Sequence, residues 1–345
     1  MTSALVVGGT GFIGLAVVDS LLARGIDVTV SRRRRSITAL VRKRPVELVR
    51  ASLDEPEALE EAMRGHDMVF VTAGYYPRYS LDLEEAVETG LRGVRNACEA
   101  ALRADVGRFV YTSSTGALAQ APASRPADER DIAPERPEGS VYRALKWAME
   151  REVERHVARG LPAVTILPGG CFGPGDLRLG TGGILVGAVR GLLPWYVDGI
   201  VPAIDVADVA EAHVEAALAP SPSPRYCVAG HSITVGELLR IIVARYGGRV
   251  PDVCLGPEEA RDRADADERR AAPTKSRVPI PRELVDVVIR LHPGLAEELL
   301  DEAGGVSRRI HVVVDGRSAV WLPERFATRV APGMTVAFFP AVAGG

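Results

Sequence analysis

The sequence predicts an α/β protein: a doubly wound parallel sheet covered by helices on both faces, followed by a small α+β module. Two observations predict the sheet. Short apolar runs alternate with amphipathic, helix-like stretches over roughly residues 3–250, and a glycine-rich turn follows the first run. A third observation places the module. Residues 256–276 are charged, rich in Ala and Pro, and poor in large apolar side chains, which indicates a linker.

The predicted elements follow one another in a regular order. The first strand leads directly into the glycine-rich turn, and the helix after it ends at Gly25, a residue type that commonly ends helices. Strands and helices then continue to alternate. The strands are expected at 4–7, 26–30, 68–73, 108–114 and 163–170, and the helices at 12–25, 59–64, 83–103 and 141–159.

Two domains are expected on either side of the linker. Residues 1–255 would bind the cofactor, with a substrate lobe drawn mainly from 171–200 and 225–255. Residues 277–345 would form the small module, in which a helix precedes three strand-like runs, RIHVVVDG, RSAVWLP and MTVAFFP.

Composition argues against several classes of function. A net charge of -3 offers no general attraction to nucleic acid or to an anionic membrane. No apolar run reaches the ~18 residues of a membrane span, and the first residues lack the features of a leader peptide. A cytoplasmic location is therefore expected. The four cysteines are scattered without a CxxC pair, so neither a disulfide framework nor a metal site is expected.

The turn GGTGFIG, residues 8–14, lies between a strand and a helix, as a dinucleotide-binding fingerprint does. Its glycines would allow a tight turn, a close approach to the pyrophosphate and close helix packing, while the helix N-terminus stabilises phosphate charge. The alternative, a glycine-rich turn of another α/β protein, agrees less well with this spacing and context. The expected cofactor contacts are Gly8, Thr10, Gly11, Phe12, Ile13 and Gly14.

The end of the second strand favours NADP over NAD. An acidic residue there would bind the ribose 2′-hydroxyl of NAD. Here Ser31 occupies that place and Arg32 to Arg35 follow it. Guanidinium groups suit a 2′-phosphate, so Arg32 and Arg33 are predicted contacts and NAD is the second choice. The alternative is a solvated basic loop.

Tyr142 and Lys146 stand four residues apart and so share one face of a helix. A nearby ammonium, together with the cofactor, is expected to lower the pKa of the phenol so that Tyr142 exchanges a proton near neutral pH. The spacing alone is a weak signal. It gains weight from Thr112, Ser113 and Ser114 at the end of an upstream strand, where a hydroxyl could bind the reacting oxygen.

These residues resemble the extended short-chain dehydrogenase/reductases of the NAD-dependent epimerase/dehydratase family. The stretches GGTGFIG, ASLDEP, VTAGYYP, RFVYTSS, YRALK, LPGGCFGPGD and DVADVAEAH carry the resemblance. The chain is most similar to the dihydroflavonol-reductase-like and hopanoid-associated sugar-epimerase branch. GPGDLRLGTGGILVGAVRGLLPWYVDG looks like that branch's substrate-side segment.

The resemblance implies roles for individual residues. Tyr142 would be the acid/base, Lys146 would hold the ribose and tune Tyr142, and Ser114 would polarise the substrate, with Ser113 as second choice. The resemblance further implies that Leu53 and Asp54 flank the adenine, that Ala73 and Gly74 line the cofactor, and that Pro168 to Cys171 pass beside the nicotinamide.

One stretch departs from the family pattern. Where the family usually carries NVxGTxN, this chain reads TGLRGVRN, with Gly90 in the first Asn position and Val94 in place of Thr. Three aromatic residues could also face the substrate, although ordinary packing is the simpler reading for each: Tyr75, Tyr76 and Trp195.

The end of the chain resembles the MoaD/ThiS sulfur carriers of the ubiquitin-like β-grasp fold. The resemblance spans about 277–345 and is most specific in PGMTVAFFPAVAGG, which ends on Gly344 and Gly345. It implies a thiocarboxylate at Gly345 and an E1-like adenylating or sulfurtransferase partner, docked near Phe338 and Phe339 unless these pack in the core. The usual first hairpin is absent, so a strand could come from elsewhere, and a structural remnant is the alternative.

The favoured function is an NADP-dependent reductase of a ketone or secondary alcohol that carries this tail. A nucleotide-sugar epimerase or dehydratase with tightly bound NAD(P) would use the same side chains. A sulfur-carrier or conjugation protein that uses the reductase fold as a platform is a third reading, and a cofactor sensor without catalysis a fourth. A homodimer through the helix that carries Tyr142 and its neighbour would fit the family.

Overall fold

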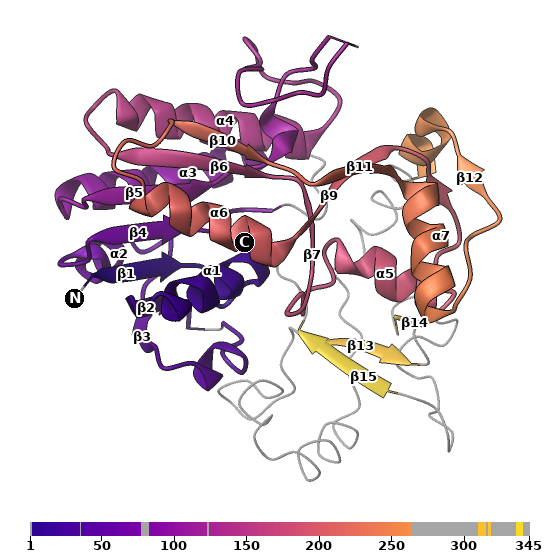
Figure 1. Ribbon diagram of the computed structural model, residues 1–345, viewed down its shortest axis with the longest axis horizontal. Helices are drawn as coiled ribbons and strands as arrows, with labels where there is room; N and C mark the ends of the chain where they lie inside the picture. The colour runs from indigo at the N-terminus through magenta and orange to yellow at the C-terminus, as the bar shows by residue number, and fades with distance from the viewer. Residues whose placement is uncertain are drawn as a thin grey trace. The chain divides into compact units, whose positions relative to one another are not determined.

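The computed structural model describes residues 2–34, 36–76, 83–122 and 124–263, and the backbone of three further strands (Figure 1). The chain divides into two compact units. Of the described residues, the first unit contains those up to Leu177 together with Ile200–Ile233, and the second contains Arg178–Gly199 and those from Thr234 onward. The predicted boundaries of the substrate lobe stay a prediction.

The first unit is built on a parallel sheet of seven strands, which confirms the predicted fold class (Figure 1). The strands are β1 (Ser3–Val7), β2 (Asp27–Arg32), β3 (Glu47–Arg50), β4 (Met68–Val71), β5 (Arg108–Thr112), β6 (Ala163–Pro168) and β10 (Arg225–Val228). Their order is β10-β6-β5-β4-β1-β2-β3, and every neighbouring pair is parallel. The order reverses at β1, and in such sheets the ligand binds beside the carboxyl ends of the strands at this point.

Helices cover both faces of the sheet because β1 is apolar on both sides. Ala4 and Val6 belong to a core cluster with α1 (Phe12–Ala23) and α6 (Val206–Leu218). Leu5 and Val7 belong to a second cluster. That cluster includes residues of α2 (Pro56–Met63), α3 (Leu83–Arg103) and α4 (Val141–Val157). This continuous burial is typical of strands in doubly wound sheets.

Shorter elements complete the first unit. Two are 3-10 turns, η1 (Val41–Lys43) and η2 (Thr115–Ala117). A second sheet has the order β11-β9-β7, formed by β7 (Gly170–Phe172), β9 (Ile200–Asp205) and β11 (His231–Thr234).

The second unit has its own small core. Its elements include α5 (Gly182–Val189), β8 (Tyr196–Val197), α7 (Val235–Tyr246) and β12 (Cys254–Leu255). Ala188 of α5 packs with Leu239 and Ile242 of α7. Thr234 and Glu237 form a capping box that begins α7.

The start of the predicted linker is helical. Residues 257–263 have helical backbone, and Arg263 pairs with Glu259 one turn earlier. Alanine and such i,i+4 ion pairs favour a helix even without a buried face, which explains the difference. The rest of the predicted linker lies outside the described residues.

The backbone described near the end of the chain forms a three-stranded antiparallel sheet, β14-β13-β15. Its strands are β13 (Ile310–Val314), β14 (Arg317–Ser318) and β15 (Val336–Pro340), and they lie within the three predicted strand-like runs. The remaining predictions for this module concern the β-grasp fold, the positions of the Phe338 and Phe339 side chains, and Gly344 and Gly345. All of them lie outside the described residues.

Candidate active site

The glycine-rich turn is packed too closely for side chains. Gly8 has φ +100°, and a Cβ there would lie 2.6 Å from the backbone nitrogen of Ala73. A Cβ on Gly14 would overlap the carbonyl oxygen of Gly8. Gly14 therefore lets α1 approach both the turn that precedes it and Thr72, the residue directly after β4.

This turn presents the beginning of α1 to a ligand. The Gly11 N–H donates to the Gly8 carbonyl over 2.8 Å, and Gly11 is the N-cap of α1. No side chain caps this helix start, and its first turn contains no acidic residue. The positive end of the helix dipole thus has no negative side chain of its own helix beside it, as suits a pyrophosphate. The turn fits the predicted dinucleotide.

Arginine side chains gather where β2 ends, at the same sheet edge. Ser31 is buried, Arg32 is half-buried, and Arg33 is exposed with its N–H donating to Ser36 Oγ over 3.0 Å. The parallel register places Arg32 beside Arg50 of β3. Arg50 was not predicted as a neighbour of Arg32, because ELVR gives little sign of a strand and only the strand register shows which residues lie side by side.

Leu53 and Asp54 follow β3 at this edge. Asp54 is exposed and Leu53 is half-buried. The Leu53 carbonyl accepts a hydrogen bond from Asn96 Nδ2 over 2.7 Å, and a Cβ on Gly93 of α3 would lie 3.4 Å from the Leu53 side chain. The family-pattern residue Asn96 therefore holds the segment predicted to flank the adenine.

Ala73 and Gly74 follow β4 and connect the cofactor turn to the reactive side chains. The Ala73 N–H donates to the Val7 carbonyl over 3.0 Å. A Cβ placed on Gly74 would lie 3.9 Å from Lys146 Nζ. The glycine turn, Gly74 and Lys146 consequently belong to one continuous region.

α4 presents Tyr142 and Lys146 on one face. Ser140 begins this helix by accepting a hydrogen bond from the Arg143 N–H over 3.3 Å. Lys146 Nζ lies 6.0 Å from the centre of the Tyr142 ring. The predicted pair is thus brought together.

Ser114 lies beside Tyr142 with its hydroxyl already oriented. Ser114 Oγ accepts the Gly116 N–H over 3.1 Å, and Ser114 also hydrogen-bonds Tyr142. Because its oxygen accepts from the backbone, the hydroxyl proton remains available for an oxygen on the Tyr142 side. A Cβ on Gly116 would come within 3.2 Å of the Tyr142 ring, so the turn η2 closes tightly over it.

Burial controls the protonation of both groups. Burial raises the pKa of Tyr142 to about 12, and the hydrogen bond with Ser114 opposes that shift. Burial lowers the pKa of Lys146 to about 8, opposed by the charge of Glu150. At Tyr142 the desolvation of the phenol outweighs the hydrogen bond with Ser114, and the charges of Tyr76 and Cys171 act in the same direction as burial. The lowering of this pKa by the ammonium together with the cofactor stays a prediction.

Ser113, the second candidate hydroxyl, faces a different group. It is buried, and its hydroxyl donates to Glu150 Oε2 over 2.6 Å. Consecutive residues at the end of an extended strand point to opposite sides, which separates the two serines.

The departure at Gly90 has a packing explanation. A Cβ at Gly90 would overlap Leu145 Cδ1 of α4 and lie 3.0 Å from Met149 Sδ. A side chain at this position of α3 would therefore require the buried Leu145 and Met149 side chains of α4 to shift. Val94, the second departure, is buried in the adjoining core cluster.

The segment Pro168 to Cys171 leaves β6 beside Tyr142. The Gly169 N–H donates to the Val228 carbonyl over 2.9 Å. Burial raises the pKa of the Cys171 thiol to about 12, and this thiol is near enough to affect Tyr142. The Cys171 thiol therefore borders the site as an uncharged side chain.

The three aromatic candidates differ in their surroundings. The Tyr76 ring lies 5.1 Å from the Tyr142 ring, centre to centre, and Tyr76 is 63% exposed. Tyr75 packs against the second core cluster. Trp195 is a half-buried residue of the second unit. Of the three, Tyr76 contacts the reactive side chains within the first unit.

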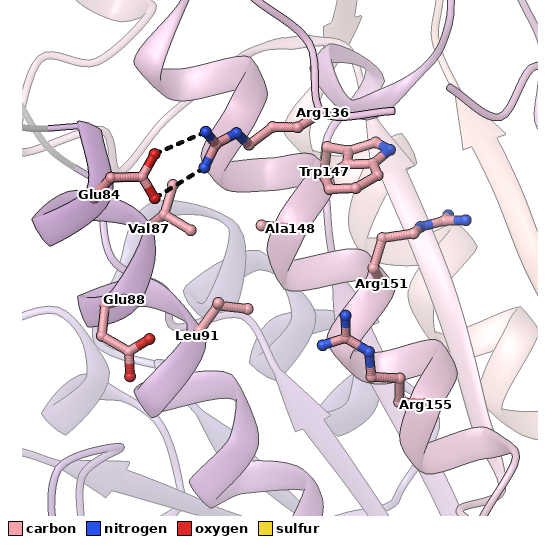
Figure 2. Close-up of a pocket in the computed structure, with 9 residues that line it drawn as sticks. All are labelled: Glu84, Val87, Glu88, Leu91, Arg136, Trp147, Ala148, Arg151 and Arg155. Atoms are coloured by element: carbon pink, nitrogen blue, oxygen red, sulfur yellow. Dashed lines mark hydrogen bonds and ion pairs between the residues drawn. The ribbon is translucent and has the colours of Figure 1, made fainter. Parts of the chain in front are cut away.

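A separate cleft lies between α3 and α4 (Figure 2). Glutamates of α3 face arginines across it, and Arg136 pairs with Glu84 over 2.7 Å. None of the residues that line it is a predicted cofactor contact. They are Glu84, Val87, Glu88, Leu91, Arg136, Trp147, Ala148, Arg151 and Arg155.

The described residues contain no group of three or more His, Cys, Asp or Glu side chains placed to hold a metal ion. They also contain no helix long and apolar enough to cross a membrane.

The fold and this site define a Rossmann-type dinucleotide-binding enzyme. Comparison with known proteins agrees, since residues 4–230 match the NAD dependent epimerase/dehydratase family. The chain belongs to this family. It is consequently an NAD(P)-dependent oxidoreductase or epimerase that uses a nicotinamide cofactor.

Individual relatives include both reductases and epimerases. The chain is 28% identical to a sterol demethylase protein B of Methylococcus capsulatus, over 79% of this chain and 84% of that one. It is 31% identical to a putative dihydroflavonol 4-reductase of Synechocystis, over 61% of each. A solved nucleoside-diphosphate-sugar epimerase of Pseudomonas aeruginosa is 26% identical with a TM-score of 0.69, over 77% of this chain and 84% of that one.

Proposed function

We propose that this chain is an NADP-dependent reductase that converts a ketone to a secondary alcohol. The observation that carries the proposal is the orientation of Ser114. Its oxygen accepts a hydrogen bond from the Gly116 N–H, so its hydroxyl can donate a hydrogen bond to a substrate carbonyl beside Tyr142. The similarity to the putative dihydroflavonol 4-reductase of Synechocystis adds support.

The chain's own residues would divide the work. Residues 8–14 and the start of α1 would bind the pyrophosphate, with Leu53, Asp54, Ala73 and Gly74 along the rest of the cofactor. When bound, the nicotinamide supplies a hydride to the carbonyl carbon. The carbonyl oxygen, held by Ser114, would take the proton of the Tyr142 hydroxyl, and Lys146 would stabilise the phenolate left behind.

The arginines at the end of β2 support NADP. Arg32 and Arg33 lie where the ribose of a bound dinucleotide is expected. Replacing each with Ala should weaken NADPH binding at least about tenfold and leave NADH binding nearly unchanged. Arg159→Ala removes the same charge from an exposed residue just beyond α4 and serves as the control. Equal loss for both cofactors would contradict the NADP assignment.

The decisive experiment is NADPH oxidation by the full chain with a panel of aromatic and aliphatic ketones. Turnover that Tyr142→Phe abolishes supports the reductase. The second candidate, a nucleotide-sugar epimerase, is favoured by the solved epimerase relative. It would instead be purified with NAD(P) tightly bound and would interconvert UDP-sugars without net oxidation, because its hydride returns to the substrate.

The tail carries a separate proposal. We propose that Gly345, after Gly344, is converted to a thiocarboxylate by an E1-like adenylating or sulfurtransferase partner. The sequence resemblance supports this. Intact mass of the protein from its own cells would show replacement of one oxygen by sulfur. An unmodified carboxylate under several growth conditions would reject it.

We also propose a homodimer formed through α3 and α4. The cleft in Figure 2 supports this, because its glutamates and arginines could pair with those of a second copy related by a twofold axis. Sedimentation of the protein and of an Arg151→Glu variant would test it. A monomer in both cases would reject the dimer.

A further inference from the structure

A buried charged cluster lies directly behind the reactive face of α4. Glu150 follows Lys146 by four residues and Tyr142 by eight, so the three share one side of the helix. Glu150 is 1% exposed, and a carboxylate so deeply buried needs partners. It belongs to none of the predicted contacts with cofactor or substrate.

Two strands supply those partners. Ser113, at the end of β5, donates its hydroxyl proton to Glu150 Oε2 over 2.6 Å. Arg225, the first residue of β10, places NH2 2.6 Å from Glu150 Oε1, a close ion pair without hydrogen-bond geometry. Arg225 NH1 in turn donates to the Glu129 carbonyl over 2.5 Å. One carboxylate thus joins α4 to β5, to β10 and to the loop before α4.

The other charged and titratable groups around Glu150 are few. Arg151 NH2 lies 3.5 Å from Glu150 Oε1 and 2.6 Å from Glu154. Tyr111 of β5 is fully buried, and its pKa is raised well above the ordinary value by burial and by the Glu150 charge. Lys146 is the group of the proposed active site that this charge affects, because Glu150 acts to raise the pKa that burial lowers.

We propose that Glu150 is a positioning residue for the reductase reaction. Glu150 fixes α4 against β5 and β10, and its charge keeps Lys146 an ammonium at neutral pH. The proposal rests on the proposed function for its catalytic meaning. Its physical content is independent of that function. Two opposing effects set the pKa of Lys146: desolvation lowers it by favouring the neutral amine, and the Glu150 carboxylate raises it by favouring the cation.

The protonation of Lys146 can be measured without any substrate. The chain has three lysines, Lys43, Lys146 and Lys275, so reductive methylation with carbon-13 formaldehyde gives few NMR signals to assign, with Lys43→Arg and Lys275→Arg as references. Glu150→Gln should lower the pKa of Lys146 by about one unit, the effect of removing an opposite charge one helical turn away. Glu154→Gln, which removes the same charge one turn further on, should leave it within about 0.2 units. The same Lys146 titration in all three proteins would overturn the proposal.

A double variant provides the same test if Glu150→Gln alone does not fold. Glu150→Gln leaves Arg225 buried without a counter-charge, which could prevent folding. The double variant Glu150→Gln with Arg225→Met removes both charges, and the pKa of Lys146 must still lie below the unmodified value.

NADPH oxidation then separates this inference from the proposed function. If the chain reduces ketones, the alkaline limb of its pH-rate profile should move with the pKa of Lys146 in Glu150→Gln, which a merely structural role would not cause. If no ketone is reduced, the proposed function is wrong. The Lys146 titration still shows whether the Glu150 charge keeps Lys146 protonated.

Discussion

Ser114 Oγ accepts the Gly116 N–H over 3.1 Å, so the hydroxyl that meets Tyr142 is held by the backbone of its own turn. Ser113, its neighbour, donates its hydroxyl hydrogen bond to Glu150. Two serines that look interchangeable in sequence therefore have different surroundings. Their variants should behave differently.

Ser114→Ala should lower kcat/KM for ketone reduction about 10²- to 10³-fold, because it removes a donor to the developing charge. NADPH affinity should change little, since Ser114 lies outside the cofactor turn. Steady-state kinetics and NADPH fluorescence titration measure the two effects. Ser113→Ala is the control, and it should lose less activity but more thermal stability. The reverse ranking of activities would mean that Ser113 is the polarising hydroxyl.

Tyr142→Phe should reduce turnover about 10²- to 10⁴-fold, because it removes the proton that the product oxygen needs. NADPH binding should persist, since the ring and its contact with Tyr76 remain. Single-turnover absorbance at the NADPH band distinguishes loss of chemistry from loss of binding. Tyr75→Phe, in the neighbouring core cluster, is the control and should retain activity. Undiminished turnover in Tyr142→Phe would exclude Tyr142 as the acid.

Gly90→Ala should destabilise the fold by about 1–3 kcal/mol, because the added methyl meets Leu145 and Met149. Gly93→Ala, one turn along the same helix, meets only Leu53 at 3.4 Å and should be neutral or slightly stabilising through helix propensity. Urea unfolding of the two variants makes the comparison. Equal stability would show that α3 and α4 can separate at no cost, and that packing does not explain the missing Asn.

Sequence reasoning succeeded where one local pattern decides the structure. The apolar runs and GGTGFIG predicted the parallel sheet, since a continuously apolar strand can be recognised without knowing which strands it pairs with. The short strand β3 was missed because ELVR alternates weakly and pairs only through register. Glu150 was missed for a similar reason. MEREVER offers three glutamates, and only packing shows that Glu150 and Glu152 are buried while Glu154 is half-exposed.

Acid should destabilise the protein through His213 at milder pH than its carboxylates would require. His213 is fully buried on α6, with Nε2 2.7 Å from Thr112 Oγ1 and Nδ1 2.7 Å from the Val209 carbonyl. Because a carbonyl only accepts, Nδ1 carries the proton and Thr112 donates to Nε2. Burial lowers the pKa of His213 from 6.5 to about 4.

The direction in which stability changes with pH follows from the number of protons that each state binds. Between pH 6.5 and about 4, His213 is protonated in the unfolded chain and neutral in the folded chain. Stability therefore falls as pH falls through this window, by at most about 3 kcal/mol, and is constant with respect to this group above it. Urea unfolding of the chain and of His213→Gln at pH 7.5, 6, 5 and 4.5 measures how much His213 contributes to the pH dependence of the free energy of unfolding. The variant should be less stable at pH 7.5, where it lacks the ring's packing, and the difference should shrink or reverse toward pH 4.5. A difference that stays constant with pH would show that His213 titrates alike in both states and that its neutral, doubly hydrogen-bonded form does not hold α6 to β5.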